Sequence, residues 1–487
     1  MSTEPLTLHT DKYQINMMYA HWKQGTHRKR TAFDLYFRKL PFGNGYAVFA
    51  GLERVVHYIQ NIRFGDEELA YLAQQEEGYE QSFLDELRQF RFTGNLYAMP
   101  EGTLAFGGEP LLRVEAAIFE AQFIETAMLN FINYQTLIAT KAARIKAVAP
   151  EDGLLEFGTR RAQEADAAVW GARAAYVAGF DATSNMRAGM LFGIPTKGTH
   201  AHAWVQFHDT EAQAFERFAD ALPDFVTLLV DTYDTLRSGL PNAIRIAKRL
   251  EQRGKTLRGI RLDSGDLAYL SKEARRMLDE AGFPHVKITA SNDLDEHLIF
   301  NLKAQGARID IWGVGTQLIT AADQPALGGV YKLAAREKDG MMEPVIKLSG
   351  NPEKVTTPGV KAVYRIVNDE TGKAEADYIA LAEEDDVTRK QPIKLFDPLH
   401  PYLQKTVSRY TAIPLLRPIF EHGELVYTLP DLEAIRHYHQ EQLRQFWPEY
   451  LRKLNPEKYP VDLSVKLWEL KKTMMEKFRP YHIGPAE

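Results

Sequence analysis

Charged and hydroxyl side chains recur at one kind of position in this sequence, directly after short apolar runs. In chain order these segments are Gly158-Thr-Arg-Arg, Ser184-Asn, Gly198-Thr-His-Ala-His, Asp231-Thr-Tyr-Asp, Asp263-Ser-Gly-Asp, Ser291-Asn-Asp and Gly313-Val-Gly-Thr. In a parallel α/β fold, ligands bind beyond the carboxyl ends of the strands. Seven polar segments in phase with seven apolar runs therefore predict one shared binding site.

The aspartates in these segments are suited to a hard cation. They are Asp231, Asp234, Asp263, Asp266 and Asp293. Carboxylate oxygens can hold magnesium directly or through water. Taken alone, an aspartate at such a position is more often the N-cap of a following helix. Because Asp263 and Asp266 bracket Ser264-Gly265, one of them can cap a helix while the other faces the site.

Cations and glycines in the same segments are suited to an anionic ligand. Arg160, Arg161 and Arg261 are donors for phosphate or carboxylate, and the alternative is that each forms half of an ion pair. The glycines of Gly313-Val-Gly-Thr let backbone N–H groups close around a phosphate, and Thr316 adds a hydroxyl. Gly328-Gly-Val-Tyr-Lys adds Lys332 as a further cation, unless this segment is a turn with a solvated lysine.

The pair His200 and His202 leaves two chemistries open. His-X-His after a strand can bind zinc, as in metal-dependent hydrolases, but no third histidine follows another apolar run. One of the two can instead act as a general base or as a nucleophile toward a phosphoryl group. The residues alone do not decide between these roles.

The elements that must position these groups form a repeating pattern between residues 153 and 335. Apolar runs begin at Leu154, Phe180, Ile194, Thr227, Leu257, Val286 and Ile309, with helical segments between them. Such alternation indicates a parallel sheet, because parallel neighbours need a crossover connection. Near-eightfold repetition favours a closed barrel, and an open doubly wound sheet is the alternative.

The remaining sequence divides around this region. Residues 1–150 form an α+β N-terminal domain with a long helix over 119–148, and 151–335 form the α/β barrel with its active-site loops. Residues 336–430 are a return segment with a β-hairpin at 360–384. Residues 431–487 form the C-terminal helices, and the helical pattern itself covers 430–454 and 464–478.

Composition narrows the functional class. The chain has 487 residues, 45% of them hydrophobic and 25% charged, with a net charge of −6 and no cysteine. No basic field suggests nucleic acid or a membrane surface, and thiol chemistry is excluded. The start lacks the apolar core of a signal peptide and no apolar run is long enough to span a membrane. We expect a soluble, cytoplasmic protein that binds a small molecule.

In combination, the motifs resemble the nicotinate phosphoribosyltransferase family. Those that carry the resemblance are Asp11-Lys-Tyr-Gln, Pro100-Glu-Gly-Thr, Glu156-Phe-Gly-Thr-Arg-Arg-Ala-Gln, Gly198-Thr-His-Ala-His-Ala-Trp, Arg261-Leu-Asp-Ser-Gly-Asp-Leu, Gly313-Val-Gly-Thr, Gly328-Gly-Val-Tyr-Lys-Leu, Lys347-Leu-Ser-Gly-Asn-Pro-Glu-Lys and Pro358-Gly-Val-Lys. The resemblance runs from residue 6 to about residue 400.

The resemblance implies an irregular, TIM-like α/β barrel beside an α+β domain built from the N-terminal and post-barrel segments. It implies a reaction in which nicotinate and phosphoribosyl pyrophosphate give nicotinate mononucleotide and pyrophosphate, with Mg2+ as cofactor. ATP is a co-substrate, hydrolysed through a phosphohistidine, so that the enzyme is grouped with ligases when this coupling is counted. The product feeds NAD salvage, and members resemble homodimers with shared active sites.

The resemblance also assigns roles by position. His202 matches the phosphorylated histidine, which His200 does not, and Asp263 is placed with it as a catalytic residue. The expected substrate contacts are Tyr13, Phe157, Arg160, Ser184, Thr199, Arg261, Gly313, Gly315, Thr316 and Lys332. Tyr13 is expected from the partner subunit and Phe157 on the other face of the pyridine ring, although both also suit an aromatic core. Asp231 and Asp293 are expected near magnesium, directly or through water.

Three rival interpretations follow from the same residues. A nicotinamide phosphoribosyltransferase is the nearest, but that enzyme carries an acidic residue near the ring where Ser184 stands here. A metal-dependent hydrolase would use His200 and His202. A non-catalytic regulator would bind phosphoribosyl pyrophosphate without turning it over.

Overall fold

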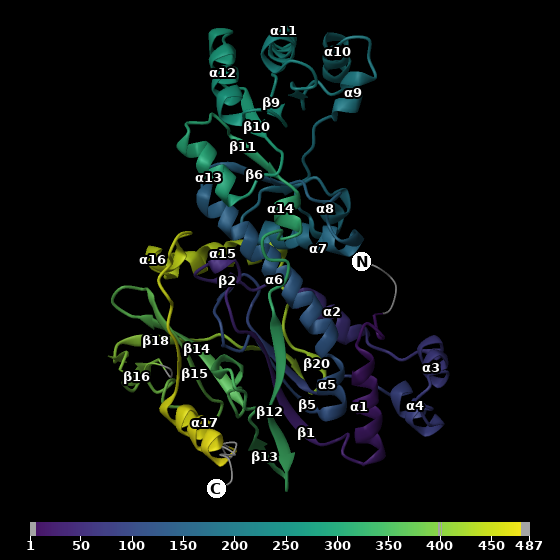
Figure 1. The fold of residues 1–487 in the computed structure, drawn as a ribbon, viewed down its shortest axis with the longest axis vertical. Helices are drawn as coiled ribbons and strands as arrows, with labels where there is room; N and C mark the ends of the chain where they lie inside the picture. The colour runs from purple at the N-terminus through teal and green to yellow at the C-terminus, as the bar shows by residue number, and fades with distance from the viewer. Residues whose placement is uncertain (1–5, 398–399, 401, 479–487) are drawn as a thin grey trace, which may run out of the picture. The chain divides into compact units, whose positions relative to one another are not determined.

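The computed structural model describes residues 6–397, 400 and 402–478, and the chain divides into two compact units (Figure 1). Unit 2 is the continuous stretch Ile138–Pro325. Unit 1 combines the residues up to Leu137 with those from Ala326 onward. The long helix α6 (Glu125–Val148) contributes residues to both. No helix among the described residues combines the length and apolar character needed to cross a membrane.

Unit 2 is built on a parallel sheet of six short strands. In spatial order these are β7 (Ala182–Thr183), β6 (Gly153–Glu156), β11 (Ile311–Val314), β10 (Lys287–Ala290), β9 (Gly259–Leu262) and β8 (Thr227–Leu229). Every pairing between them is parallel. Ile260, Ile288 and Trp312 are fully buried on adjacent strands, as expected for strands covered on both faces.

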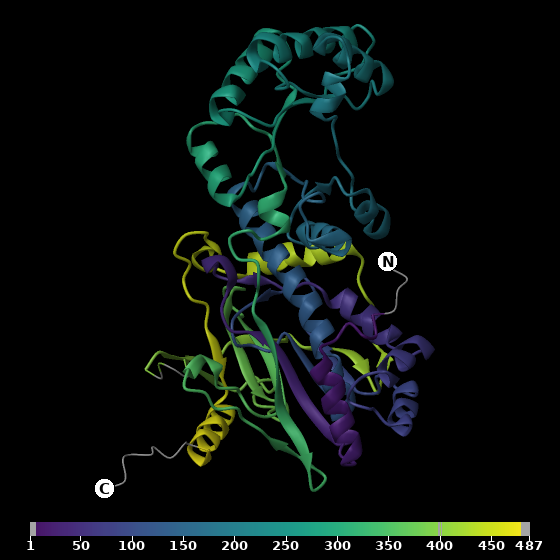
Figure 2. The same ribbon diagram turned by 45° about the vertical axis from the view of Figure 1, so that its right-hand side comes forward.

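Helices connect these strands and pack on the outer side of the curved strand run (Figure 2). They are α7 (Glu164–Val177), α8 (Met186–Phe192), α9 (His202–Gln206), α10 (Glu211–Ala221), α11 (Leu240–Glu251), α12 (Leu267–Glu280), α13 (Glu296–Ala304) and α14 (Thr316–Ile319), with a π-helical turn at Thr235–Gly239. Neighbours from α10 to α13 contact one another in succession. In α11, Ala243, Ile246, Ala247 and Leu250 form one buried stripe at helical spacing.

The parallel α/β class predicted from the sequence is confirmed, and six of the seven predicted strands are present. The run at Ile194 contributes only a single bridge, between Thr183 and Thr196. Pro195 lacks the N–H group that a longer ladder needs. Among the described residues the pairings extend from Thr196 to β8 without joining at the two ends, so a closed barrel remains a prediction.

Unit 1 contains a seven-stranded antiparallel sheet drawn from both ends of the chain. Its order is β13 (Met341–Pro344), β12 (Gly329–Lys338), β1 (Arg30–Phe37), β5 (Leu112–Ala117), β3 (Asn95–Ala98), β19 (Arg417–Glu421) and β20 (Glu424–Leu425). Thr31 of β1 pairs with Arg336 of β12. The helices of this part are α1 (Lys12–Lys23), α2 (Leu52–Asn61), α3 (Asp66–Ala73), α4 (Gln81–Arg88) and α5 (Ile118–Phe123), and α5 contacts both β1 and β5.

A second sheet in unit 1 contains the predicted hairpin. Its order is β18 (Tyr410–Pro414), β14 (Lys361–Asn368), β15 (Ala374–Leu381) and β21 (Val461–Leu463). The smaller elements are the strand pairs β2 (Ala47–Val48) with β4 (Leu104–Ala105) and β16 (Ile393–Phe396) with β17 (Gln404–Val407), and 3-10 turns at Pro41–Gly43 and Pro352–Lys354. The residues after 400 thus complete both sheets.

Of three further predicted helices, two differ in detail from the observed ones. The helix expected over 119–148 is divided at Ile124 into α5 and α6. The stretch 430–454 gives α15 (Leu432–Gln445) and the short α16 (Pro448–Leu451), because Phe446 is extended and the residue before Pro448 disfavours helix. The last predicted helix is confirmed as α17 (Val465–Lys477).

Candidate active site

Arg261 joins several strand ends of unit 2. Its Nε donates to Ser291 Oγ at 2.8 Å, one terminal nitrogen donates to Thr199 Oγ1 at 3.2 Å, and the other donates to Asp263 Oδ1 at 2.9 Å. Ser291 Oγ also donates to the same Asp263 oxygen. The Arg261 side chain is 19% exposed. Its planar guanidinium is therefore held in one orientation, with part of its edge open to a ligand.

The aromatic ring of Phe157 lies beside this fork. The guanidinium carbon of Arg261 is 5.5 Å from the Phe157 ring centroid. A Cβ atom at Gly313 would lie only 2.6 Å from Cδ2 of the ring, so glycine is needed there to seat Phe157. The backbone N–H of Phe157 donates to Val314 O at 2.8 Å, which fixes the start of its loop. A half-buried ring and a cation thus share one edge of the sheet.

Glu156 holds the start of the Phe157 loop through hydrogen bonds, a role that we did not predict. Its side chain is buried and accepts hydrogen bonds from Gly158 N–H and from Thr183 Oγ1, the latter at 2.5 Å. Burial raises the pKa of the Glu156 carboxyl above its ordinary value, and the two hydrogen bonds oppose that rise. The signal in the sequence was a lone carboxylate inside the apolar run Leu154-Leu-Glu-Phe.

His202 begins α9 and faces two carboxylates. Its Nδ1 lies 3.1 Å from Thr232 Oγ1. Its Nε2 lies 3.9 Å from Asp231 Oδ1 and 3.8 Å from Asp263 Oδ2. The side chain is 37% exposed, so Nε2 is accessible while Nδ1 is anchored. Thr232 was missed from the sequence, because a threonine after a strand carries no distinctive signal.

His200 occupies a different environment. Its side chain is buried, and its Nε2 accepts a hydrogen bond from Leu229 N–H at 3.2 Å. Its Nδ1 must then carry the proton, and it lies 3.3 Å from Ala201 O. Burial lowers the pKa of His200. Both nitrogens are therefore engaged with backbone groups, which leaves no lone pair for zinc or for a phosphoryl group.

Asp231 presents an oxygen that lacks a hydrogen-bond partner. Its Oδ2 accepts from Asp263 N–H at 2.7 Å and from Ser264 Oγ at 2.8 Å. Its Oδ1 is buried without a partner, and the side chain is only 2% exposed. A buried acceptor of this kind normally binds a proton donor or a cation. Asp231 therefore fits the oxygen donor set that magnesium prefers.

The other aspartates divide between the two roles that the sequence left open. Asp234 accepts from Leu236 N–H and Arg237 N–H, and Asp266 accepts from Tyr269 N–H, so both are N-caps. Asp293 is exposed in a left-handed conformation with φ 44°. No group of three or more His, Cys, Asp or Glu side chains arranged to hold a metal occurs among the residues that the structure describes.

The other residues of unit 2 that were expected to contact substrate follow the ends of β6, β7 and β11. Arg160 and Arg161 are exposed, and neither forms an ion pair within the described residues. Ser184 is exposed, and its N–H donates to Glu156 O at 2.9 Å. Gly315 precedes α14, where Thr316 is the first residue. These groups are available to a ligand, as is the part of the Arg261 fork that is not engaged by Ser291, Thr199 and Asp263.

Two expected contacts belong to unit 1. Tyr13 lies on α1 with 49% of its surface exposed, which is not the environment of a core aromatic. Lys332 lies within β12, where its Nζ donates to Tyr331 O at 2.9 Å and burial lowers its pKa. The alternative of a turn with a solvated lysine is therefore wrong, because Gly329–Lys338 is a paired strand.

The fold and this cluster define a class of protein. Acidic, cationic and aromatic side chains meet at the carboxyl ends of parallel strands, which is the arrangement of an α/β enzyme that acts on a small anionic molecule.

Comparisons with known proteins specify the family. The nicotinate phosphoribosyltransferase (NAPRTase) N-terminal domain matches residues 8–133, the NAPRTase family matches 153–376, and the NAPRTase C-terminal domain matches 360–471. The chain is 58% identical to a nicotinate phosphoribosyltransferase of Bacillus subtilis, over 96% of this chain and 95% of that protein. It is 34% identical to the Homo sapiens protein of that name, over 95% of both chains.

Solved structures agree with this result. The crystal structure of human nicotinic acid phosphoribosyltransferase superposes with a TM-score of 0.84 at 31% identity, covering 96% of this chain and 99% of that one. A nicotinate-nucleotide pyrophosphorylase from Pyrococcus furiosus superposes with a TM-score of 0.69 at 25% identity, covering 92% and 98%. The chain belongs to the nicotinate phosphoribosyltransferase family.

Proposed function

We propose that this protein is a nicotinate phosphoribosyltransferase, which joins nicotinate to the ribose of phosphoribosyl pyrophosphate and releases pyrophosphate. The observation that carries the proposal is the adjacency of the Arg261 fork and the Phe157 ring. An aromatic face beside a fixed guanidinium matches a planar ring that bears a carboxylate. Thr199 Oγ1, which accepts from the same fork and donates to His200 O at 3.1 Å, would help to hold Arg261 in this orientation.

The chemical step is a substitution at C1 of the ribose. The pyridine nitrogen forms the new bond to C1 as the bond from C1 to the pyrophosphate oxygen breaks, and pyrophosphate leaves with that electron pair. Phe157 on one face of the ring, and Tyr13 from the partner subunit on the other, would hold nicotinate in line for attack. This role for Tyr13 requires a homodimer with shared sites, and the exposure of Tyr13 supports it.

Negative charge develops on the leaving pyrophosphate, and magnesium would neutralise it. Asp231 and Asp263, with Asp293 through water, are the residues that would hold this ion, and the partnerless Asp231 oxygen supports the assignment. The remaining phosphate contacts would come from Arg160, Lys332 and the segment from Gly313 through Gly315 to Thr316. Arg160 suits this role because it is exposed and has no ion pair within the described residues.

ATP is proposed to drive the reaction through His202. Its Nε2 would attack the γ-phosphorus of ATP, so that an N–P bond forms while the bond to the ADP oxygen breaks. Water would later hydrolyse this phosphohistidine to phosphate. The anchored Nδ1 and the accessible Nε2 support this step, because they leave one lone pair directed outward. Hydrolysis of ATP through this intermediate would shift the equilibrium toward nicotinate mononucleotide. That product would enter NAD salvage in the cytoplasm.

Choice of the acid over the amide would come from charge. Arg261 pairs with a carboxylate more strongly than with a neutral amide, and Ser184 places no acidic group in this region. A nicotinamide enzyme is the remaining alternative within the fold. A zinc hydrolase is disfavoured because both nitrogens of His200 are occupied.

Pyrophosphate release from phosphoribosyl pyrophosphate with magnesium tests the proposal. Nicotinate and nicotinamide are compared, each with and without ATP. We expect release with nicotinate and a higher rate when ATP is added. Release with nicotinamide but not with nicotinate would refute the substrate assignment, and a rate indifferent to ATP would refute the coupling.

A further inference from the structure

Unit 1 contains a cavity that the proposed reaction does not use. It has a volume of about 600 Å3, within the range of sites for small molecules. Its walls come from β1 and the loop after it, from the segment before β14, and from α17. The proposed nicotinate and phosphohistidine groups, Arg261, Phe157 and His202, are not among its lining residues.

Two ammonium groups meet at Thr357 in the wall of this cavity. Lys361 Nζ donates to Thr357 O at 2.8 Å, and Lys471 Nζ donates to Thr357 Oγ1 at 3.1 Å. Lys361 is fully buried and pairs with Asp34 Oδ2 at 2.7 Å. Lys471 has no carboxylate partner within the described residues. One positive charge near Thr357 is therefore left without a counter-ion.

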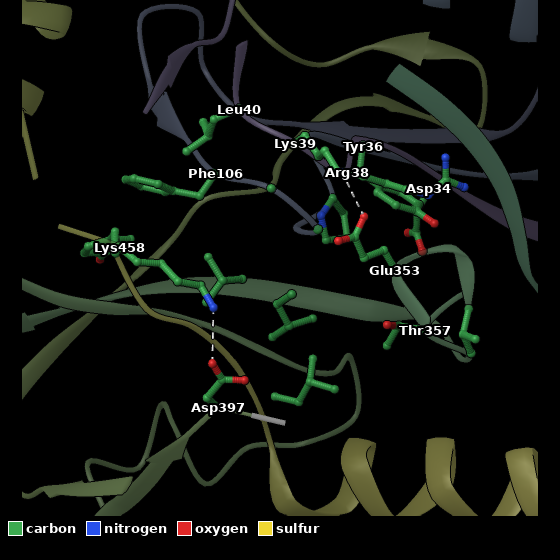
Figure 3. Close-up of a pocket in the computed structure, with 18 of the residues that line it drawn as sticks. Asp34, Tyr36, Arg38, Lys39, Leu40, Phe106, Glu353, Thr357, Asp397 and Lys458 are labelled. Atoms are coloured by element: carbon green, nitrogen blue, oxygen red, sulfur yellow. Dashed lines mark hydrogen bonds and ion pairs between the residues drawn. The ribbon is translucent and has the colours of Figure 1, made fainter. Parts of the chain in front are cut away.

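The other charges around Thr357 do not compensate Lys471. Arg113, which faces Lys361, pairs with Glu115 at 2.8 Å. The ion pairs Lys39–Glu353, at 3.4 Å, and Lys458–Asp397, at 3.2 Å, are internally balanced and lie at exposed lysines (Figure 3). Burial and the neighbouring Lys361 lower the pKa of Lys471 to about 8, the expected effect of an uncompensated charge.

Two donor positions at Thr357 match one carboxylate. The Thr357 hydroxyl accepts from Lys471, so its own proton is free to be donated, and Lys471 keeps N–H groups that point elsewhere. Two donors about 3 Å apart suit the two oxygens of a carboxylate. Asp34, which Lys361 joins to Thr357, has a buried Oδ1 without a hydrogen-bond partner, and Figure 3 shows it with Tyr36 and Arg38.

Apolar and aromatic side chains make up much of the remaining lining, together with charged residues that include Arg38 and Glu457. Trp468, Lys471 and Met475 share one face of α17 at helical spacing. Leu40, Phe106, Val355 and Leu463 complete these walls. A phosphate group would place its additional charged oxygens against such side chains, whereas the body of an organic acid would be buried by them.

We propose that this cavity is a second ligand site, which binds a small organic carboxylate through Lys471 and Thr357 and packs its apolar body between β1 and α17. The site is independent of the proposed catalytic reaction. Its occupant is defined by a single carboxylate, an apolar or aromatic body and a size within the cavity volume.

Calorimetric titration of the full-length protein with 4-phenylbutyrate tests this proposal, with no nicotinate present. We expect binding to the wild type and at least tenfold weaker binding to K471M, since a charge-assisted hydrogen bond is lost. K472M is the matched control, because Lys472 is the exposed neighbour on the same helix, and its affinity should equal that of the wild type. R261A should also bind normally, which separates this site from the catalytic one.

Two further ligands test the chemistry. 4-Phenylbutanol should bind at least tenfold more weakly than the acid, and 2-phenylethyl phosphate should not exceed the acid. Absence of binding to the wild type, equal binding to K471M, loss of binding in R261A, or preference for the alcohol or the phosphate would each overturn the proposal. If thermal unfolding shows that K471M is not folded, T357V replaces it, with the same loss expected.

Discussion

Replacing Arg261 by alanine should remove the preference for nicotinate over nicotinamide. The guanidinium makes three hydrogen bonds, to Ser291, Thr199 and Asp263, so it is held in place before any ligand arrives. A hydrogen bond from a charged group contributes about 1.5–3 kcal/mol. We therefore expect kcat/KM for nicotinate, relative to that for nicotinamide, to fall by roughly 10- to 150-fold.

The ratio of the two substrates is the quantity to measure, because R261A also deprives Asp263 of its cation and this loss affects both substrates. Pyrophosphate release is followed at varied concentrations of each. R258A is the matched control, since Arg258 precedes the same strand, is exposed and lies 4.5 Å from the Phe225 ring. R261K should be intermediate, because it keeps the charge without the fork. A change of less than tenfold in R261A would refute the assignment.

Three more perturbations have defined outcomes. H202N should retain nicotinate-dependent pyrophosphate release but lose both stimulation by ATP and incorporation of label from γ-labelled ATP. H297N, at an exposed histidine, is the control and should behave as wild type. Incorporation of the γ-phosphate label into H202N would contradict the assignment. G313A should lower the free energy of unfolding by about 1–3 kcal/mol and raise KM for nicotinate, because its Cβ would displace the Phe157 ring; G350A, whose Cβ would meet no atom within 4 Å, is the control for chemical denaturation and kinetics. His439 is buried against Gly102 O, and burial lowers its pKa to about 4 from 6.5. As the pH falls, His439 is protonated in the unfolded chain before it is protonated in the folded one. The contribution of neutral His439 to the free energy of unfolding is therefore fully present above pH 6.5, and about 3 kcal/mol of it is lost as the pH falls toward 4. Urea unfolding at pH 7 and pH 4.5 should therefore show a smaller acid loss for H439Q than for wild type, and equal losses would exclude this cause.

The sequence predicted what depends on local pattern. Apolar runs alternating with helices gave the parallel sheet of unit 2, and the polar segment after each run gave the cluster around Arg261. Neither required knowledge of long-range contacts. The hairpin at 361–381 followed in the same way, from two apolar runs and a turn.

What the sequence left open depends on contacts between distant residues. The N-cap roles of Asp234 and Asp266 and the orphaned oxygen of Asp231 differ only in which N–H groups lie nearby. The separation of His200 from His202 rests on the amide of Leu229, which is distant in sequence. Glu156 was missed because one carboxylate in an apolar run has no periodicity.

The pairing of β1 with β12 has a consequence for the synthesis of the chain. Thr31 meets Arg336 only after about 300 further residues have been added, which takes roughly 15–60 s at about 5–20 residues per second. Unit 2 is a continuous stretch and is translated in full during that interval. Until β12 emerges, β1 keeps one edge unpaired and open to the strands of other nascent chains. The yield of folded enzyme therefore depends on how that edge is protected on the ribosome.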